Sequence, residues 1–195
     1  EAEAHILGGT QLPGPSVVVT FDDGLVDHGP AAKVLEAAEI RGIFFVTSRP
    51  LKDRVPLVVH KVHWLRATTP PDDFRKEFNG LVPAEWAEPH HGAQDAEAAA
   101  KIYVYDSPAD AMLKYRINFR LPHDVVDAVT SAMMKSRGIS GGEFCQGTYL
   151  NAEGVRALQD AGHLVAAHGH SHTPFSRLEP HELATDIQTN VDCLT

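Results

Sequence analysis

The sequence predicts an α/β fold around a parallel sheet, and three short apolar runs carry that prediction. Residues 16–21 and 43–46 are rich in β-branched and aromatic side chains, as buried strands are, and a helical stretch separates them. A third run, residues 163–167, follows another amphipathic segment. Because a strand–helix–strand order implies parallel strands and right-handed crossovers, we expect all three runs in one sheet. Residues 50–147 break the alternation, and we expect a helical insertion there.

The composition indicates a soluble globular protein and excludes two classes of partner. The chain has 195 residues, of which 43% are hydrophobic and 22% charged, enough for one domain with a substantial core. A formal net charge of −9 argues against nucleic acids and anionic membrane surfaces as partners. Apolar runs fall short of the roughly 18 residues that a membrane span needs. No signal peptide is recognisable in the chain, and the native compartment stays open.

The first four residues are expected to lie outside the fold. Residues 1–4 (Glu-Ala-Glu-Ala) are similar to the remnant of a yeast secretion leader, which indicates recombinant secretion and leaves residues 5–195 as a single domain. Two cysteines, Cys145 and Cys193, are too few for a disulfide framework and are not spaced like a zinc clip. Whether the two form one bridge stays open at this level.

The helix between the first two strands is expected over residues 28–39. Helical spacing places four apolar side chains on one face, and Gly42 is expected to end the helix before the next strand. The four side chains are those of Ala31, Val34, Leu35 and Ala38.

Two more helices are expected on either side of the third strand. Asn151 is a good N-cap for the first, whose buried face would be Val155, Leu158 and Ala161, and Gly162 ends it. Ser176 and Glu179 have the spacing of a capping box for the second helix. Its apolar positions are Leu183, Ile187, Val191 and Leu194. A parallel α/β unit that stops on a helix looks cut short, so the C-terminal part of the sheet is expected to be absent.

Residues suited to metal chemistry follow two of the predicted strands. Asp22 and Asp23 come after the first strand, and His168 and His172 come after the third. Parallel sheets build their sites where strands end at their carboxyl edge. Asp23, His168 and His172 therefore make a candidate triad for one divalent ion, with Asp22 beside it. A carboxylate next to a metal-bound water is the minimal apparatus of metal-assisted hydrolysis.

Simpler interpretations of these residues remain open. The chain has 12 histidines, so the cluster at 168–172 could be a His-rich surface turn. An Asp-Asp-Gly sequence is also an ordinary turn, in which Gly24 permits positive φ. Gly169 and Pro174 favour a loop over a helix for the cluster, and His170, between the two candidate ligands, is expected to face away.

The same residues resemble a known family. The run Thr-Phe-Asp-Asp-Gly at 20–24 is similar to the first motif of the polysaccharide deacetylases, the NodB-like enzymes of carbohydrate esterase family 4. The run His-x-x-x-His at 168–172 is similar to their second motif, with Gly169 where Ser or Thr is usual. The flanks at 41–46 and 158–163 also resemble the family.

The resemblance implies a partial or distorted (β/α) barrel of the NodB-like type and a deacetylase activity. Asp22 would be the catalytic base, and Asp23, His168 and His172 would be the metal ligands. The ion would be Zn²⁺, with Co²⁺ or another divalent ion as alternatives. The substrate would be an acetylated glycan, which loses an N- or O-acetyl group to a metal-activated water.

The chain departs from the family pattern in ways that keep alternatives open. The two motifs are unusually far apart, and no stretch after His172 matches the later motifs that supply an oxyanion site and a general acid. The segment Arg120-Leu121-Pro122-His123 is superficially similar to one of them, but it precedes the second motif. One alternative is a catalytically incomplete metal- or carbohydrate-binding module. Another is a hydrolase of C–N bonds in small amides. A homo-oligomer that completes the site is also compatible with the sequence, and no substrate-binding residue is identified.

Overall fold

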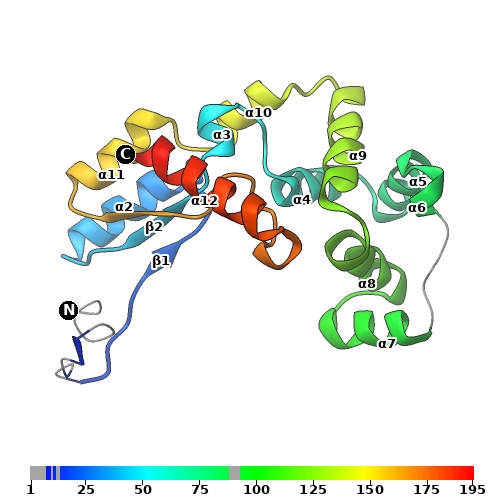
Figure 1. The fold of residues 1–195 in the computed structure, drawn as a ribbon, viewed down its shortest axis with the longest axis horizontal. Helices are drawn as coiled ribbons and strands as arrows, with labels where there is room; N and C mark the ends of the chain where they lie inside the picture. Colours follow the sequence, from blue (N-terminus) through cyan, green and yellow to red (C-terminus); the bar gives the residue numbers. More distant parts are fainter. Residues whose placement is uncertain (1–7, 10, 12–13, 88–92) are drawn as a thin grey trace. The chain divides into compact units, whose positions relative to one another are not determined.

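The computed structural model describes residues 8–9, 11, 14–87 and 93–195. Residues 1–4, expected to be a processing remnant, lie outside this part. Three strands form a small parallel sheet in the order β1-β2-β3 (Figure 1). They are β1 (Thr20–Phe21), β2 (Ile43–Val46) and β3 (Leu164–Ala167). Within the described residues the sheet stays open, so the structure is a mixed α/β fold rich in helix and not a closed barrel.

The register of the sheet places the carboxyl ends of all three strands at one edge. Phe44 in the central strand is opposite Phe21 in β1 and Val165 in β3. Parallel direction follows from the helical connections, because each crossover returns the chain to the same starting edge. The segments that leave β1 and β3 therefore start at the same edge of the sheet, on either side of β2.

The first strand is shorter than the sequence predicts. Pairing begins at Val19, whose carbonyl accepts a hydrogen bond from the amide of Ile43 at 3.0 Å. Val17 and Val18 are 89% and 51% exposed. A continuous buried strand over 16–21 is thus wrong, because a β-branched run becomes a strand only where a neighbouring strand offers backbone partners.

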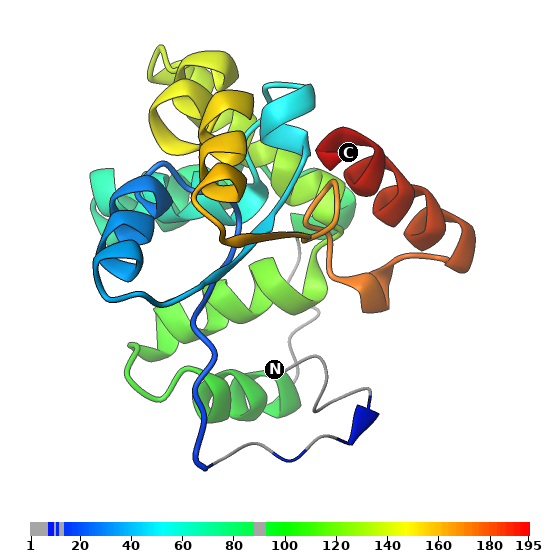
Figure 2. The same cartoon turned by 90° about the vertical axis from the view of Figure 1, so that its left-hand side faces the viewer.

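Two helices cover one face of the sheet and form its core. Helix α2 (His28–Ala37) and helix α11 (Ala152–Asp160) pack on the same side, as Figure 2 shows. Their buried residues meet the fully buried ring of Phe44, which stacks on Phe21 with 4.8 Å between the ring centroids. The core residues of the two helices are Ala32, Leu35 and Leu158.

The helix boundaries agree better with the sequence than the buried faces do. Leu35 is buried as expected, but Val34 is 70% exposed, and α2 buries His28 and Ala32 instead. Asn151 caps α11 as expected, because its side chain accepts the Gly154 amide at 2.8 Å. Ala161, expected to be buried, is exposed.

The last helix, α12 (Pro180–Leu194), packs against β3 with an unexpected face and cap. Its capping box joins Glu179 and Glu182, whereas Ser176 lies in the short 3₁₀ turn Phe175–Arg177. The residues that this helix buries are Asp186 and Asn190, and the apolar side chains of Ile187 and Val191 are 41% and 37% exposed.

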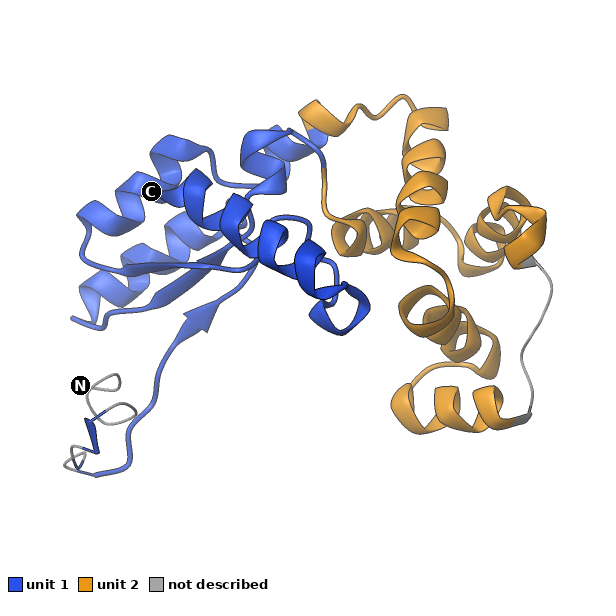
Figure 3. Cartoon of the chain, viewed as in Figure 1, with its two compact units in different colours: residues 1–55, 144–195 blue, residues 56–143 orange. Residues whose placement is uncertain are grey.

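The chain divides into two compact units (Figure 3). The first comprises residues 1–55 and 144–195 and holds the sheet; the second comprises residues 56–143, close to the insertion expected at 50–147. The second unit is helical, with a core that includes Leu65, Phe74, Phe78 and Met133. The remaining helices are α3 (Arg49–Lys52), α4 (Val58–Thr68), α5 (Pro71–Leu81), α6 (Ala84–Ala87), α7 (Ala93–Ile102), α8 (Pro108–Tyr115), a π-helical turn (Arg116–Arg120), α9 (His123–Ser136) and α10 (Gly141–Thr148).

The structure also bears on membrane spans and on the two cysteines. None of the helices in the described ranges is both long and apolar enough to cross a membrane. Cys145 and Cys193, both in the described part, do not form a disulfide.

Candidate metal centre

Asp23 leaves β1 in a left-handed turn. Asp23 has φ 76° and Gly24 has φ 74°, a conformation that glycine adopts freely and aspartate more readily than most residues. The hydroxyl of Thr47, just after β2, donates to the Asp23 carbonyl at 3.1 Å. The chain thus leaves the extended conformation at Asp23, just after the end of β1.

His168 and His172 lie at the two ends of a tight loop that leaves β3. The amide of His168 continues the ladder by donating to the carbonyl of Val46 at 3.2 Å. Gly169 and His172 then adopt φ values of 75° and 59°, which turn the chain back on itself. The expected loop is therefore present, and it brings two imidazoles to the same side.

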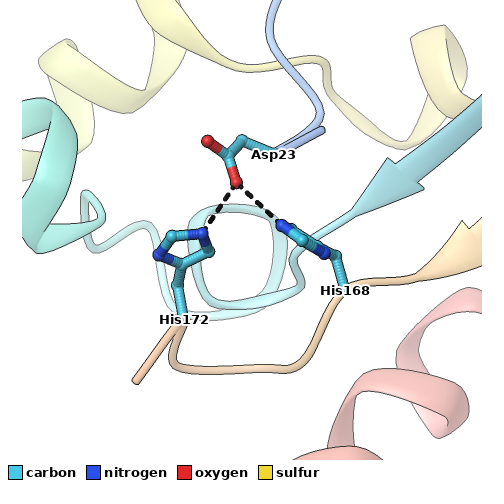
Figure 4. A group of neighbouring side chains, drawn as sticks. All are labelled: Asp23, His168 and His172. Atoms are coloured by element: carbon cyan, nitrogen blue, oxygen red, sulfur yellow. Dashed lines mark ion pairs between the residues drawn. The ribbon is translucent and has the colours of Figure 1, made fainter. Parts of the chain in front are cut away.

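The three candidate ligands converge on one point (Figure 4). Oδ1 of Asp23 lies 3.0 Å from Nε2 of His172 and 3.3 Å from Nε2 of His168. One ligand atom from each residue lies within 4.8 Å of the others. Their side chains are 17% to 31% exposed, so the cluster is sheltered but reachable. One carboxylate oxygen and two imidazole nitrogens fit a divalent ion of the zinc type that keeps positions open for water or substrate.

Electrostatics at the cluster reflect the close carboxylates. The hydrogen bond with Asp23 raises the pKa of His168 above its ordinary value, against an opposing effect of burial. The charge of Asp22 raises the same pKa in the same direction. A site that favours a proton on His168 is a site with negative potential, which also favours a metal cation.

Asp22 is placed beside the cluster and not within it. Its side chain is exposed, and it is not among the three grouped ligand donors. The charge of Asp22 is nevertheless one of the causes that raise the pKa of His168.

His170 points away from the cluster, as its place between the ligands suggests. Its Nε2 lies 3.1 Å from a carboxylate oxygen of Asp53, and its Nδ1 lies 2.9 Å from the hydroxyl of Ser48. Both ring nitrogens are thus engaged by the segment that follows β2. His170 anchors the loop and is not a fourth ligand.

A pocket of about 430 Å³ opens beside the two histidines. Its walls are the loop residues after His172, which include Pro174 and Phe175, together with Ile187 of α12. The ring of Phe175 is 48% exposed. This partly apolar pocket lies next to two candidate ligands, so it could hold an apolar part of a small molecule bound at the cluster.

Two residues at the site were not identified from the sequence. Asp186 and Asn190, both in α12, hydrogen-bond to the backbone of the loop that carries His168 and His172. The available signal was their spacing of four residues on one helix, but the stronger apolar periodicity of the neighbouring face masked it.

Arg120, in the segment that superficially resembles a later family motif, pairs with Asp95 within the second unit.

One comparison with known proteins finds a similarity, and it covers the C-terminal part of the chain, without Asp22 and Asp23. The family model described as polysaccharide deacetylase matches residues 121–195, a segment that includes β3, both histidines and α12. This match supports a NodB-like polysaccharide deacetylase domain over that part of the chain, and with it a hydrolase acting on acetylated carbohydrate. Searches of curated proteins and of solved structures found no match.

Proposed function

We propose that this protein is a metal-dependent carbohydrate deacetylase, with Asp23, His168 and His172 holding one divalent ion. The observation that carries the proposal is the convergence of three donor atoms from residues up to 149 positions apart within 4.8 Å. That arrangement arises at the carboxyl edge of a parallel sheet, where such sites are built. The family match supplies the acetylated substrate class.

Zinc is the ion that the donor set fits best. Catalytic zinc sites use three protein ligands drawn from His and carboxylate groups and leave the fourth position open. Cobalt accepts the same ligands. When bound, such an ion polarises a carbonyl oxygen and lowers the pKa of a water molecule.

Asp22 is proposed as the catalytic base. The side chain of Asp22 is exposed, so its carboxylate is accessible to water and to a substrate. It would take the proton of the attacking water as the water oxygen bonds to the acetyl carbonyl carbon. A positioned base of this kind contributes roughly 10²–10⁴-fold to the rate.

The general acid is not assigned by these four residues. A second copy of the chain could supply the general acid in a homo-oligomer. A measurement of the molar mass in solution tests whether such an oligomer forms. The binding-only alternative predicts a protein that loads zinc and binds oligosaccharide without turnover.

The test combines acetate release with metal content. Wild-type protein with added Zn²⁺ should release acetate from N-acetylated chito-oligosaccharides. Asp22→Asn should keep the metal but lose at least about 100-fold of the rate. Asp23→Ala and His168→Ala should lose the metal itself. Asp27→Asn, an exposed aspartate nearby in the chain, is the matched control and should change neither quantity.

Each outcome bears on a separate part of the proposal. Equal metal content in the wild type, Asp23→Ala and His168→Ala would contradict the ligand assignment. No acetate from a zinc-loaded wild type, with acetylated xylan and small amides also inert, would favour the binding module. Release that persists in Asp22→Asn would remove Asp22 as the base.

A further inference from the structure

Helix α12 presents a buried carboxylate to the loop between the two histidines. The side chain of Asp186 accepts the amide of His170 on Oδ2 at 2.7 Å and the amide of Ser171 on Oδ1 at 2.8 Å. Asp186 is 8% exposed. Both carboxylate oxygens are therefore used on two consecutive backbone N–H groups in the middle of the loop.

Asn190, one turn further along α12, supports the loop at its first ligand. It has no exposed surface. Its Oδ1 accepts the amide of His168 at 2.9 Å, and its Nδ2 donates to the carbonyl of Val46 at 3.0 Å. This amide joins the end of β2 to the residue that offers the first imidazole.

Apolar packing does not account for the orientation of α12. The helix turns Asp186 and Asn190 inward while the side chains of Ile187 and Val191 stay partly exposed. Burying a charged group costs free energy unless hydrogen bonds replace its water. In the described part of the chain, the hydrogen bonds that replace this water come from the amides of His170 and Ser171, so contacts with the loop favour this orientation of the helix.

Gly169 shows that the carboxylate and the loop are fitted to each other. A Cβ at this position would lie 2.8 Å from Oδ2 of Asp186, and the residue has φ 75°. A side chain here would displace the carboxylate and strain the backbone. This close contact and the positive φ explain why glycine occupies position 169, where the similar family motif has Ser or Thr.

We propose that Asp186, assisted by Asn190, is a positioning residue of the metal centre. It holds the backbone between His168 and His172 so that both Nε2 atoms face Asp23. The inference rests on the proposed metal centre, but the hydrogen bonds on which it depends exist without a metal. Supporting groups behind metal ligands typically affect metal affinity about 10- to 100-fold.

The test compares Asp186→Asn with Asp192→Asn. An amide offers one acceptor oxygen, so Asp186→Asn should leave one loop amide without a partner. We expect zinc affinity, measured by competition with a chelator, to fall about 10- to 100-fold. The visible absorption bands of bound Co²⁺ should also change, because they report ligand geometry. Asp192→Asn removes an exposed carboxylate of the same helix and should match the wild type in both measurements.

A third measurement needs neither metal nor a variant. In the metal-free wild type, the amides of His170 and Ser171 should exchange with solvent far more slowly than those of exposed loops. Rapid exchange at both would overturn the inference even if Asp186→Asn fails to fold. A folded Asp186→Asn with wild-type zinc affinity and cobalt spectrum would overturn it as well.

Failure of the metal centre itself would look different. A wild type that binds neither zinc nor cobalt, yet protects the two amides, would contradict the proposed function. In that case Asp186 would have only a structural role, and the positioning inference would fall with the metal centre.

Discussion

At the scale of single residues, the site depends on backbone conformations that few side chains tolerate. Asp23 and His172, two of the three candidate ligands, have φ values of 76° and 59°. Left-handed conformations cost non-glycine residues roughly 1–2 kcal/mol each. Such outliers gather where the surrounding structure holds them for a function. Two of the four non-glycine residues with positive φ in the described part are thus candidate ligands, and the other two are Glu39 and Arg54.

His28 is a buried histidine at the start of α2. It is 6% exposed, it packs against the rings of Phe21 and Phe44, and its Nδ1 has no hydrogen-bond partner in the described structure. Burial lowers the pKa of His28 below its ordinary value of 6.5, although the neighbouring aspartates oppose the shift. The folded state therefore binds this proton less readily than the unfolded state does.

We predict that His28→Leu removes a pH-dependent part of the stability. Because the folded pKa is lowered, the wild type has its full stability above about pH 6.5 and loses some as the pH falls through the folded pKa. The variant, with no proton to gain, should become more stable relative to the wild type at pH 5 than at pH 7.5. Urea unfolding of both metal-free proteins at the two pH values measures the difference. If the free energies of unfolding of the two proteins differ by the same amount at both pH values, the prediction is contradicted.

At the scale of elements, Gly42 shows how tightly α2 and β2 pack. The sequence suggests that this glycine ends the helix, but α2 ends at Ala37 and the left-handed residue after it is Glu39, with φ 56°. A Cβ on Gly42 would lie 2.7 Å from Cδ1 of Leu35 and 3.2 Å from Phe44. The glycine is needed because a core helix passes close to the strand.

Gly42→Ala should therefore destabilise the protein by about 1–3 kcal/mol, the usual cost of overfilling a packed core. Gly29→Ala is the matched control, because Gly29 lies within α2 and a Cβ there meets no atom within 4 Å. The control should be neutral or stabilising by up to about 1 kcal/mol, since alanine favours helix. Chemical denaturation of the two variants decides the matter, and equal effects would contradict the packing argument.

At the scale of the whole molecule, the candidate metal centre lies in one of the two units. All three ligand candidates and both supporting residues of α12 belong to the unit formed by residues 1–55 and 144–195. The other unit has its own core, in which Phe78 is fully buried and stacks on Phe74 with 5.8 Å between ring centroids.

Damage to the second core should accordingly leave metal binding intact. We expect Phe78→Ala to lower the stability of the second unit by about 3–5 kcal/mol without changing the zinc dissociation constant. Phe44→Ala is the matched control. It removes a fully buried ring that stacks on Phe21, the residue that precedes Asp22 and Asp23, and it should weaken zinc binding. Thermal unfolding and zinc titration of both variants test this. A weakened zinc affinity in Phe78→Ala would mean that the second unit contributes to the site.

The parts of this protein that follow from its sequence are those governed by local pattern and chain direction. The strands at 43–46 and 164–167, the cap at Asn151 and the class of the sheet depend on neighbouring residues in the chain. Parallel strands end at one edge, so the sequence alone predicts that Asp23 lies near His168.

What only the tertiary structure decided is the burial of polar groups. Nothing in the periodicity of α12 indicates that Asp186 faces inward, because the amides that stabilise it lie 15 and 16 residues earlier in the chain. The shortness of β1 and the exposure of Val34 have the same origin. Each depends on which distant group is available as a partner, and hydrogen bonding and packing partners are set by the folded arrangement and not by local sequence.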